Sequence, residues 1–207
     1  DAGSKSRVAY LENPNLLDNY DPKAEPVKKA VASLLATLTG KDKPADVWKD
    51  LGITPDDTVA VKIAALGDAR TSTAKEVVDA VTASLVDAGV KPENIIVWDK
   101  LERDLNRSGF SVGTPKANPQ TRAVIAGATS DTPGLGWEPN DPQDTSIGKI
   151  LISDTLKPKT VLHLSDGLIV KYAGSRSFDA NYASAPGILL ASKDPVALDA
   201  MAIDRFE

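Results

Sequence analysis

Cysteine is absent from this 207-residue chain, and several kinds of chemistry are absent with it. Disulfide bonds, thiolate metal sites, iron–sulfur ligation and cysteine nucleophiles are all excluded. Aromatic residues make up 5% of the sequence, so Ala, Val, Leu and Ile must form most of the core. No apolar run approaches the roughly 20 residues that a transmembrane helix needs. We therefore expect an aliphatic core and no transmembrane segment.

The charge balance is mildly acidic, with 24 Lys and Arg against 29 Asp and Glu and a net charge of −5. No basic stripe stands out, so we expect no nucleic-acid partner. The length favours a single domain over residues 1–207. The small, polar stretch Asp1–Ser6 lacks an initiator Met, which favours a mature end left by signal cleavage. We expect a periplasmic or otherwise exported protein, with a cytoplasmic one as the alternative.

The clearest pattern is a strand, a helix and a second strand between residues 58 and 98. Thr58–Leu66 is β-branched and almost continuously apolar, as in a strand buried on both faces. Thr73 followed by Glu76 has capping-box spacing and predicts a helix that runs to about Ala88. Asn94–Trp98 is the next buried strand. Because two strands joined by a crossover helix are normally parallel neighbours, this segment predicts a βαβ unit.

Further elements follow from apolar spacing and from turn residues. Residues 27–38 have the spacing of an amphipathic helix, ended by Gly40, and Asp194-Pro195 begins the last helix. Residues 111–145 form a long irregular region rich in Pro, Gly, Asn and Asp, with one strand inside it. We predict a single α/β domain with a mainly parallel sheet flanked by helices, Rossmann-like in three layers. The other predicted strands are 7–11, 122–126, 160–167 and 187–192.

Six segments of the sequence form an ordered set: 59–63 (VAVKI), 73–78 (TAKEVV), 85–90 (LVDAGV), 93–100 (ENIIVWDK), 164–168 (LSDGL) and 191–200 (ASKDPVALDA). Taken together and in this order, they resemble the domain of unknown function 362 family. The resemblance covers roughly residues 7–109 and 159–205.

This resemblance implies an α/β fold, a bacterial or archaeal origin and, in many members, a twin-arginine export signal. Some members carry ferredoxin-type cluster domains, which a chain without cysteine excludes here. The family's activity is not established as a class, so no catalytic role carries over. Two features depart from the family. Ile63-Ala64 stands where members usually place Asn after the strand lysine, and no central block with a histidine and a Leu-Lys-Asn element occurs between Phe110 and Pro158.

The end of the first βαβ strand is the predicted ligand site, because ligands of parallel sheets bind beyond the carboxyl ends of the strands. Free N–H groups at the following helix and a nearby arginine would favour an anion. Ordinary helix capping beside a solvated arginine is the competing and commoner interpretation. The candidate ligand-binding residues are Lys62, Arg70, Thr71, Ser72, Thr73, Asp99 and Lys100.

Two residues are catalytic candidates. Lys62 lies in an apolar strand, where a lysine with a lowered pKa serves as a base, a Schiff-base former or an anion clamp. The alternative is a lysine paired with a carboxylate or reaching solvent. His163, the single histidine, is a candidate base or metal ligand. However, strand alternation puts His163 and Asp166 on opposite faces, which favours a hydrogen-bonded core histidine.

Three functions are compatible with these features, and we expect no cofactor. The first is an accessory module that docks on a partner protein or assembly, indicated by the departures from the family and by the long loop of residues 111–144. The second is an enzyme or binder of a small anionic ligand near Lys62, Thr73 and Asp99. The third, and weakest, is a divalent-metal protein that uses Asp99, Asp166 and Asp199.

Overall fold

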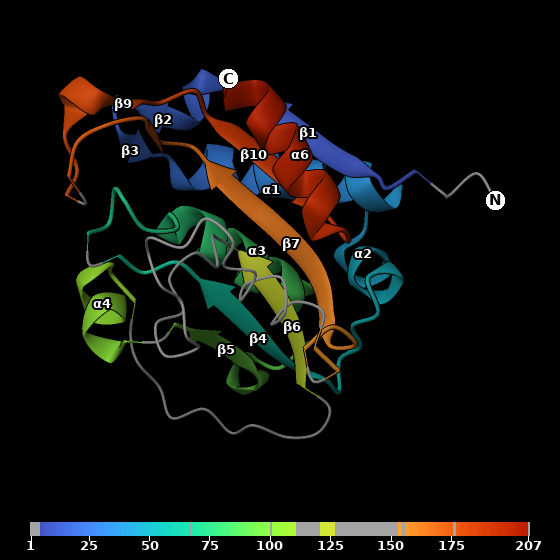
Figure 1. Cartoon of the computed structure of the whole chain (residues 1–207). Coiled ribbons are helices and arrows are strands. Elements are labelled where there is room, and N and C mark those ends of the chain that lie inside the picture. The colour runs from blue at the N-terminus through green and yellow to red at the C-terminus, as the bar shows by residue number, and fades with distance from the viewer. Residues whose placement is uncertain are drawn as a thin grey trace.

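A six-stranded sheet forms the centre of the molecule, in the order β1–β10–β7–β6–β4–β5 (Figure 1). The computed structural model describes residues 5–66, 68–99, 101–110, 153–154, 156–175 and 177–206, and of residues 121–126 and 206 the backbone alone. The strands of this sheet are β1 (Val8–Glu12), β4 (Thr58–Ile63), β5 (Ile95–Trp98), β6 (Thr121–Ala126), β7 (Thr160–Gly167) and β10 (Ile188–Ser192).

The βαβ unit predicted from the sequence is present. β4 and β5 pair in parallel, with Val59 opposite Ile95, and α3 (Lys75–Asp87) connects them. β6 lies parallel to β4 on its other side and to β7 beyond. Apolar side chains at helical spacing, among them Val77, Val81 and Leu85, bury one face of α3 completely. The helix is thereby fixed on the sheet by the periodicity that the sequence shows.

The prediction of a mainly parallel, Rossmann-like three-layer fold is wrong. Of the seven strand pairings among the described residues, β1–β10, β10–β7, β2–β3 and β8–β9 are antiparallel, which makes four, and three are parallel. β10 runs against both of its neighbours, so the central sheet is mixed. The physical reason is the connection between β7 and β10. It contains no described crossover helix and returns through a two-stranded ribbon, and a strand that returns this way runs antiparallel.

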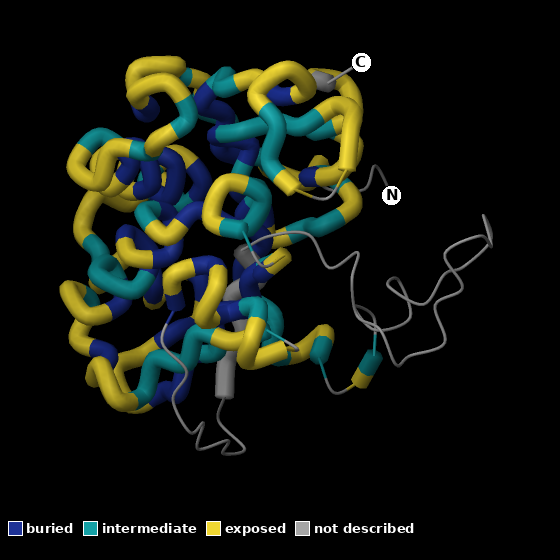
Figure 2. The backbone as a smooth tube through the Cα atoms, turned by 90° about the vertical axis from the view of Figure 1, so that its left-hand side faces the viewer, coloured by how far each residue is buried: buried dark blue, intermediate teal, exposed yellow. Residues whose placement is uncertain are grey.

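The helices cover the two faces of the sheet unequally. On one face α1 (Ala24–Thr39) packs against α3, β1 and β10, and α2 (Pro44–Asp50) packs against α1 and α3. This side holds the larger core, seen as buried segments through the interior of the molecule (Figure 2). On the other face α6 (Pro195–Phe206) packs across β10, β1 and β7, around a smaller core of Ile188, Leu190 and Leu198. Within the described parts of the chain, no helix has the length and hydropathy of a bilayer span.

Two small ribbons lie next to each other at one end of the sheet. The stretch after β1 holds a short antiparallel pair, β2 (Leu17–Asp18) with β3 (Asp21–Pro22). The second pair is β8 (Val170–Lys171) with β9 (Ala183–Ser184). The Tyr20 hydroxyl, from the first ribbon, donates to the Ala183 carbonyl of the second at 3.0 Å. These ribbons, together with α4 (Glu102–Arg107), surround the end of the sheet to which β4 and β7 point (Figure 1).

Candidate functional site

A cleft of about 1160 Å³ opens at the carboxyl ends of β4 and β7, where α3 begins. Its floor comes from these two strand ends and from the first turn of α3. Its walls come from the β2–β3 ribbon, the end of α4 and the chain that follows β7. The lining residues that the following paragraphs use are Tyr20, Asp21, Ala64, Leu66, Asp68, Arg70, Thr71, Ser72, Thr73, Ala74, Lys75, Glu76, Arg107, Ser108, Asp166, Leu168, Lys171 and Phe178.

The hydroxyl groups predicted to bind a ligand mostly hold the loop between β4 and α3 together. Thr73 Oγ1 accepts the Ala64 N–H at 3.0 Å, and the Thr73 N–H donates to the Ala64 carbonyl at 2.9 Å. Ser72 Oγ accepts the Leu66 N–H and lies 2.8 Å from Ser108 Oγ of the α4 region. Thr71 Oγ1 contacts the Asp68 carbonyl at 3.4 Å. These residues line the cleft, but their side chains already have backbone partners.

Lys62 and Asp99 form a buried ion pair beside the cleft and do not line it. Lys62 Nζ lies 2.9 Å from Asp99 Oδ1, and the two side chains are 8% and 10% exposed. Asp99 Oδ2 also accepts the Ala65 N–H at 2.6 Å, and the ammonium lies 5.9 Å from the centre of the Trp98 ring. This is the paired alternative considered for Lys62. The pair joins the end of β4 to the residue after β5, and Lys100 lies outside the described residues.

Asp166 caps α3 from a distant strand. The helix begins at Lys75, and its N-cap residue Ala74 has no side-chain cap of its own. Instead, Asp166 Oδ2 accepts the Ala74 N–H at 2.7 Å, and Oδ1 accepts the Leu168 N–H at 3.0 Å. The capping box predicted from Thr73 and Glu76 is therefore not what caps the helix. Burial raises the pKa of Asp166 above its ordinary value, the two N–H donors oppose this effect, and the nearby Glu76 adds to it.

His163 lies on the opposite face of β7 from Asp166, as strand alternation predicts. It is 8% exposed, pairs in register with Ser192 of β10, and does not line the cleft. Burial lowers the pKa of His163, and the carboxylate of Asp194 partly offsets that shift. Asp194 caps α6 as expected, because its Oδ1 accepts the N–H groups of Val196 and Ala197. The structure does not bring His163 together with the other candidate residues.

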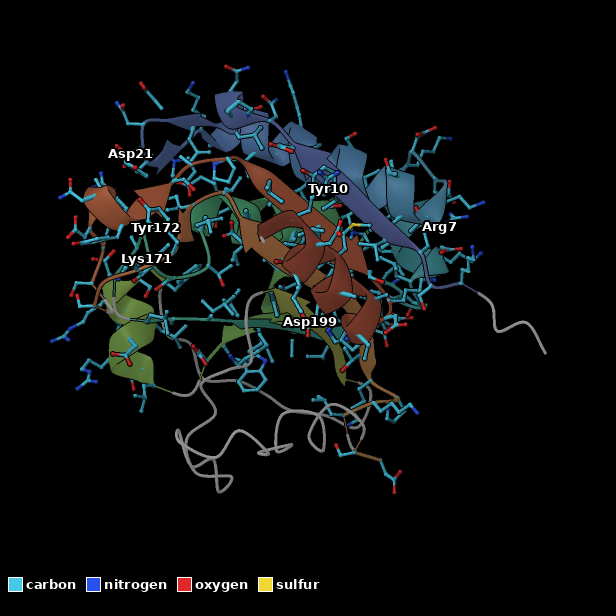
Figure 3. All side chains as sticks on the ribbon, turned by 45° about the horizontal axis from the view of Figure 1, so that its top comes forward. Arg7, Tyr10, Asp21, Lys171, Tyr172 and Asp199 are labelled. Carbon is cyan, nitrogen blue, oxygen red and sulfur yellow. The ribbon has the colours of Figure 1, made fainter. Side chains whose placement is uncertain are left out.

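The three carboxylates proposed for a metal do not meet. Asp99 is paired with Lys62, Asp166 caps α3, and Asp199 lies on α6. Figure 3 shows Asp199 well apart from Asp21, Lys171 and Tyr172 at the cleft end of the molecule. Within the part of the chain that the structure describes, no three Asp, Glu or His side chains are arranged to hold a metal ion.

Charged side chains of both signs converge on the cleft. Two of its cations are already neutralised: Arg70 pairs with Asp21 at 2.7 Å, and Lys75 pairs with Asp79 one helical turn later. The Arg107 side chain has no carboxylate or hydrogen-bond partner among the described residues, and Lys171 Nζ donates to a backbone carbonyl at 2.7 Å. Among the described residues, the lining holds four cations, Arg70, Lys75, Arg107 and Lys171, and four carboxylates, Asp21, Asp68, Glu76 and Asp166.

Of the residues that line the cleft, the sequence predicted Arg70 and the three hydroxyl residues 71–73. It gave no signal for Asp21, Arg107, Lys171 and Phe178. These residues belong to three segments far apart in the chain, and each looks like an ordinary surface residue on its own.

No protein-family model, curated protein or solved structure matches the chain. The resemblance to the domain of unknown function 362 family therefore stays a prediction, and the functional argument rests on the cleft itself.

Proposed function

We propose that this protein binds a small charged metabolite in the cleft at the ends of β4 and β7. The observation that carries the proposal is the convergence of eight charged side chains on one cavity at the carboxyl ends of parallel strands. Such strand ends are the usual ligand position in sheets of this kind. Binding sites also characteristically combine a concave surface with a few converging polar groups. Of the residues predicted from sequence for an anion site, this cleft includes Arg70 and residues 71–73 but not Lys62 or Asp99.

The anionic part of the ligand is assigned to Arg107 and Lys171. Arg70 and Lys75 are held by carboxylates of the protein, whereas Arg107 and Lys171 face no carboxylate among the described residues. A carboxylate or phosphate bound between these two cations would gain charge-assisted hydrogen bonds. This argues for at least one negative group on the ligand.

The carboxylates of the lining require a complementary group on the same ligand. Glu76 lies close enough to Asp166 for its charge to add to the raised pKa of Asp166, and both residues line the cleft. Hydroxyl or amine groups can donate to such oxygens, whereas a second anionic group would be repelled. The ligand class is therefore a metabolite with a carboxylate or phosphate at one end and hydroxyl or amine groups at the other.

Thermal unfolding in the presence of metabolites tests this proposal. The panel contains amino acids, hydroxy acids and sugar phosphates, with neutral sugars and simple amines as comparison compounds. A bound ligand stabilises the folded state by RT ln(1 + [L]/Kd) and so raises the melting temperature as its concentration rises above Kd. In Arg107→Gln we expect binding of the active compound to weaken by about 10- to 100-fold, because a hydrogen bond to a charged group contributes about 1.5–3 kcal/mol.

The matched control is Arg103→Gln, one turn earlier on the same helix. Arg103 pairs with its neighbour Asp104 and does not line the cleft. Its substitution should leave binding within about twofold, since surface changes away from special features have small effects. A panel in which no compound raises the melting temperature would overturn the proposal. Equal losses in both variants would overturn the assignment of Arg107.

The docking role remains a separate prediction. It is based on the two departures from the family and on the loop of residues 111–144. The side chains of that loop lie outside the described residues, so the structure adds no support to this role. Its test is purification from the native source, in which a partner should accompany the chain. Recovery of the chain alone would count against it.

A further inference from the structure

The segment 177–184 forms part of the wall of the cleft and is held there by one cluster of contacts. The Arg70 guanidinium donates from Nη2 to Asp21 Oδ1 at 2.7 Å and from Nε at 3.3 Å. The same guanidinium stacks on the Phe178 ring, 5.2 Å from its centre. Tyr20 meets that ring edge-on, with 4.9 Å between centroids and 67° between planes. Its hydroxyl then donates to the Ala183 carbonyl at 3.0 Å.

We refer to Tyr20, Asp21, Arg70 and Phe178 as the latch. Three of its side chains come from elements other than the segment they hold: the β2–β3 ribbon and the loop before α3. All four line the cleft. The latch therefore joins three separate parts of the chain at the rim of the proposed ligand site.

Apart from the latch, the contacts of segment 177–184 are mostly with the neighbouring stretch 170–172. Ala183 and Ser184 pair with Lys171 and Val170, Lys171 Nζ donates to the Ser177 carbonyl at 2.7 Å, and the Tyr172 hydroxyl donates to the Asn181 carbonyl at 3.0 Å. Ala183 is 7% exposed, and no described residue between Leu168 and Ala183 is buried. Tyr172 and Tyr182 on this stretch are 67% and 44% exposed. A region with few buried apolar contacts opens at much lower free energy than the whole protein. The latch, whose ion pair is itself exposed, is what ties this wall to the β2–β3 ribbon and to the loop before α3.

We propose that segment 177–184 is a lid on the cleft and that the latch sets how often it opens. Opening breaks the stack of Arg70 on Phe178 and lifts Phe178 away from the lining. Because the Arg70–Asp21 pair is 45% and 70% exposed, salt should weaken it and raise the open fraction. This inference goes beyond ligand binding and concerns the protein without ligand.

Native-state hydrogen exchange, resolved by peptide and read without any ligand, tests the lid. Opening is local unfolding of the segment once the latch releases it, so it also breaks the two hydrogen bonds that report on it: Tyr182 N–H to the Asp179 carbonyl at 3.0 Å, and Tyr172 N–H to the Tyr182 carbonyl at 3.1 Å. In Asp21→Asn we expect exchange in 177–184 to rise about two- to fivefold, from the usual effect of an exposed ion pair. In Arg70→Gln, which also loses the stack, we expect a rise of about 5- to 30-fold.

Asp18→Asn is the matched control, because Asp18 lies opposite Asp21 on the same ribbon and carries the same charge. It should leave the exchange of 177–184 unchanged. High salt should raise exchange in the wild type and have little effect in Asp21→Asn. Unchanged exchange in both latch variants, or an equal rise in Asp18→Asn, would overturn the lid. A rise of the same size in β4 would also overturn it, because that indicates global unfolding. None of these outcomes depends on whether a ligand is found.

Discussion

At the residue scale, the ion pair between Lys62 and Asp99 differs from the other ion pairs in its burial. Its side chains are 8% and 10% exposed, against 45% and 70% for Arg70 and Asp21. Breaking a buried pair leaves one charge in a poorly solvated position, which costs about 3–5 kcal/mol, whereas exposed pairs contribute about 0.2–1 kcal/mol. We expect Asp99→Asn to lower the free energy of unfolding in urea by several times as much as Asp21→Asn. Equal losses would show that Lys62 reaches solvent.

The buried His163 makes the free energy of unfolding depend on pH, and the direction of that dependence follows from its lowered pKa. Burial holds its folded-state pKa below the ordinary 6.5, so the unfolded chain binds more protons between the two values. The contribution of the neutral, buried His163 to the free energy of unfolding is therefore fully present above pH 6.5. It is lost as the pH falls through that value towards the lowered pKa. His163→Gln should remove this part of the acid sensitivity, measured as the free energy of unfolding from pH 7.5 to pH 5. An unchanged slope in the variant would contradict the assignment.

At the element scale, Gly187 forms the tight backbone turn immediately before β10. Its φ of 70° is left-handed, and an added Cβ would lie 2.1 Å from the Asn13 carbonyl oxygen. Gly40, the C-cap of α1, has nearly the same φ of 71° with no atom within 4 Å of that position. We expect Gly40→Ala to cost about 1–2 kcal/mol of unfolding free energy from the left-handed backbone alone. Gly187→Ala should cost about 1–3 kcal/mol more, through the clash with a backbone that cannot move freely.

Thermal or urea unfolding of the two glycine variants measures that difference directly. The backbone strain is shared, so the difference reports on the space around Gly187. The Asn13 N–H donates to the Gly187 carbonyl at 3.0 Å, which fixes the two segments close together. Equal costs would mean that the loop after β1 shifts without penalty.

The elements with strong local patterns were predictable, and their relations to one another were less so. The helix at 27–38, Gly40 as its C-cap and Asp194 as the cap of α6 follow from spacing and residue type alone. The direction of β10 does not, because Ile188–Ser192 is buried throughout and reads the same in either direction. The cap of α3 does not either, since it comes from Asp166, 92 residues from the Ala74 N–H that it accepts.

At the scale of the whole molecule, the same limit applies to the candidate site. Sequence reasoning located the end of β4 and the paired lysine beside it, which are consequences of one local βαβ pattern. The cleft needs the chain after β7 to fold back over that end, and Phe178 then meets Arg70 from more than a hundred residues away. Contacts of this separation depend on the mixed topology of the sheet, which the local pattern does not encode.

β7 joins the parallel half of the sheet to the antiparallel half, because it pairs with β6 in one sense and with β10 in the other. Its Leu164 is 2% exposed in a core that also contains Val61 of β4 and Leu189 of β10. A shared core couples the halves, so we expect a single cooperative unfolding transition. Leu164→Ala should lower the free energy of unfolding by about 2–5 kcal/mol. Leu101→Ala, at a side chain that is 44% exposed, should change the free energy of unfolding by about 0.5 kcal/mol or less. Far-UV circular dichroism and hydrogen exchange at β4 should report the same loss in Leu164→Ala. Exchange at β4 that is unaffected while β10 is destabilised would show that the two halves unfold separately.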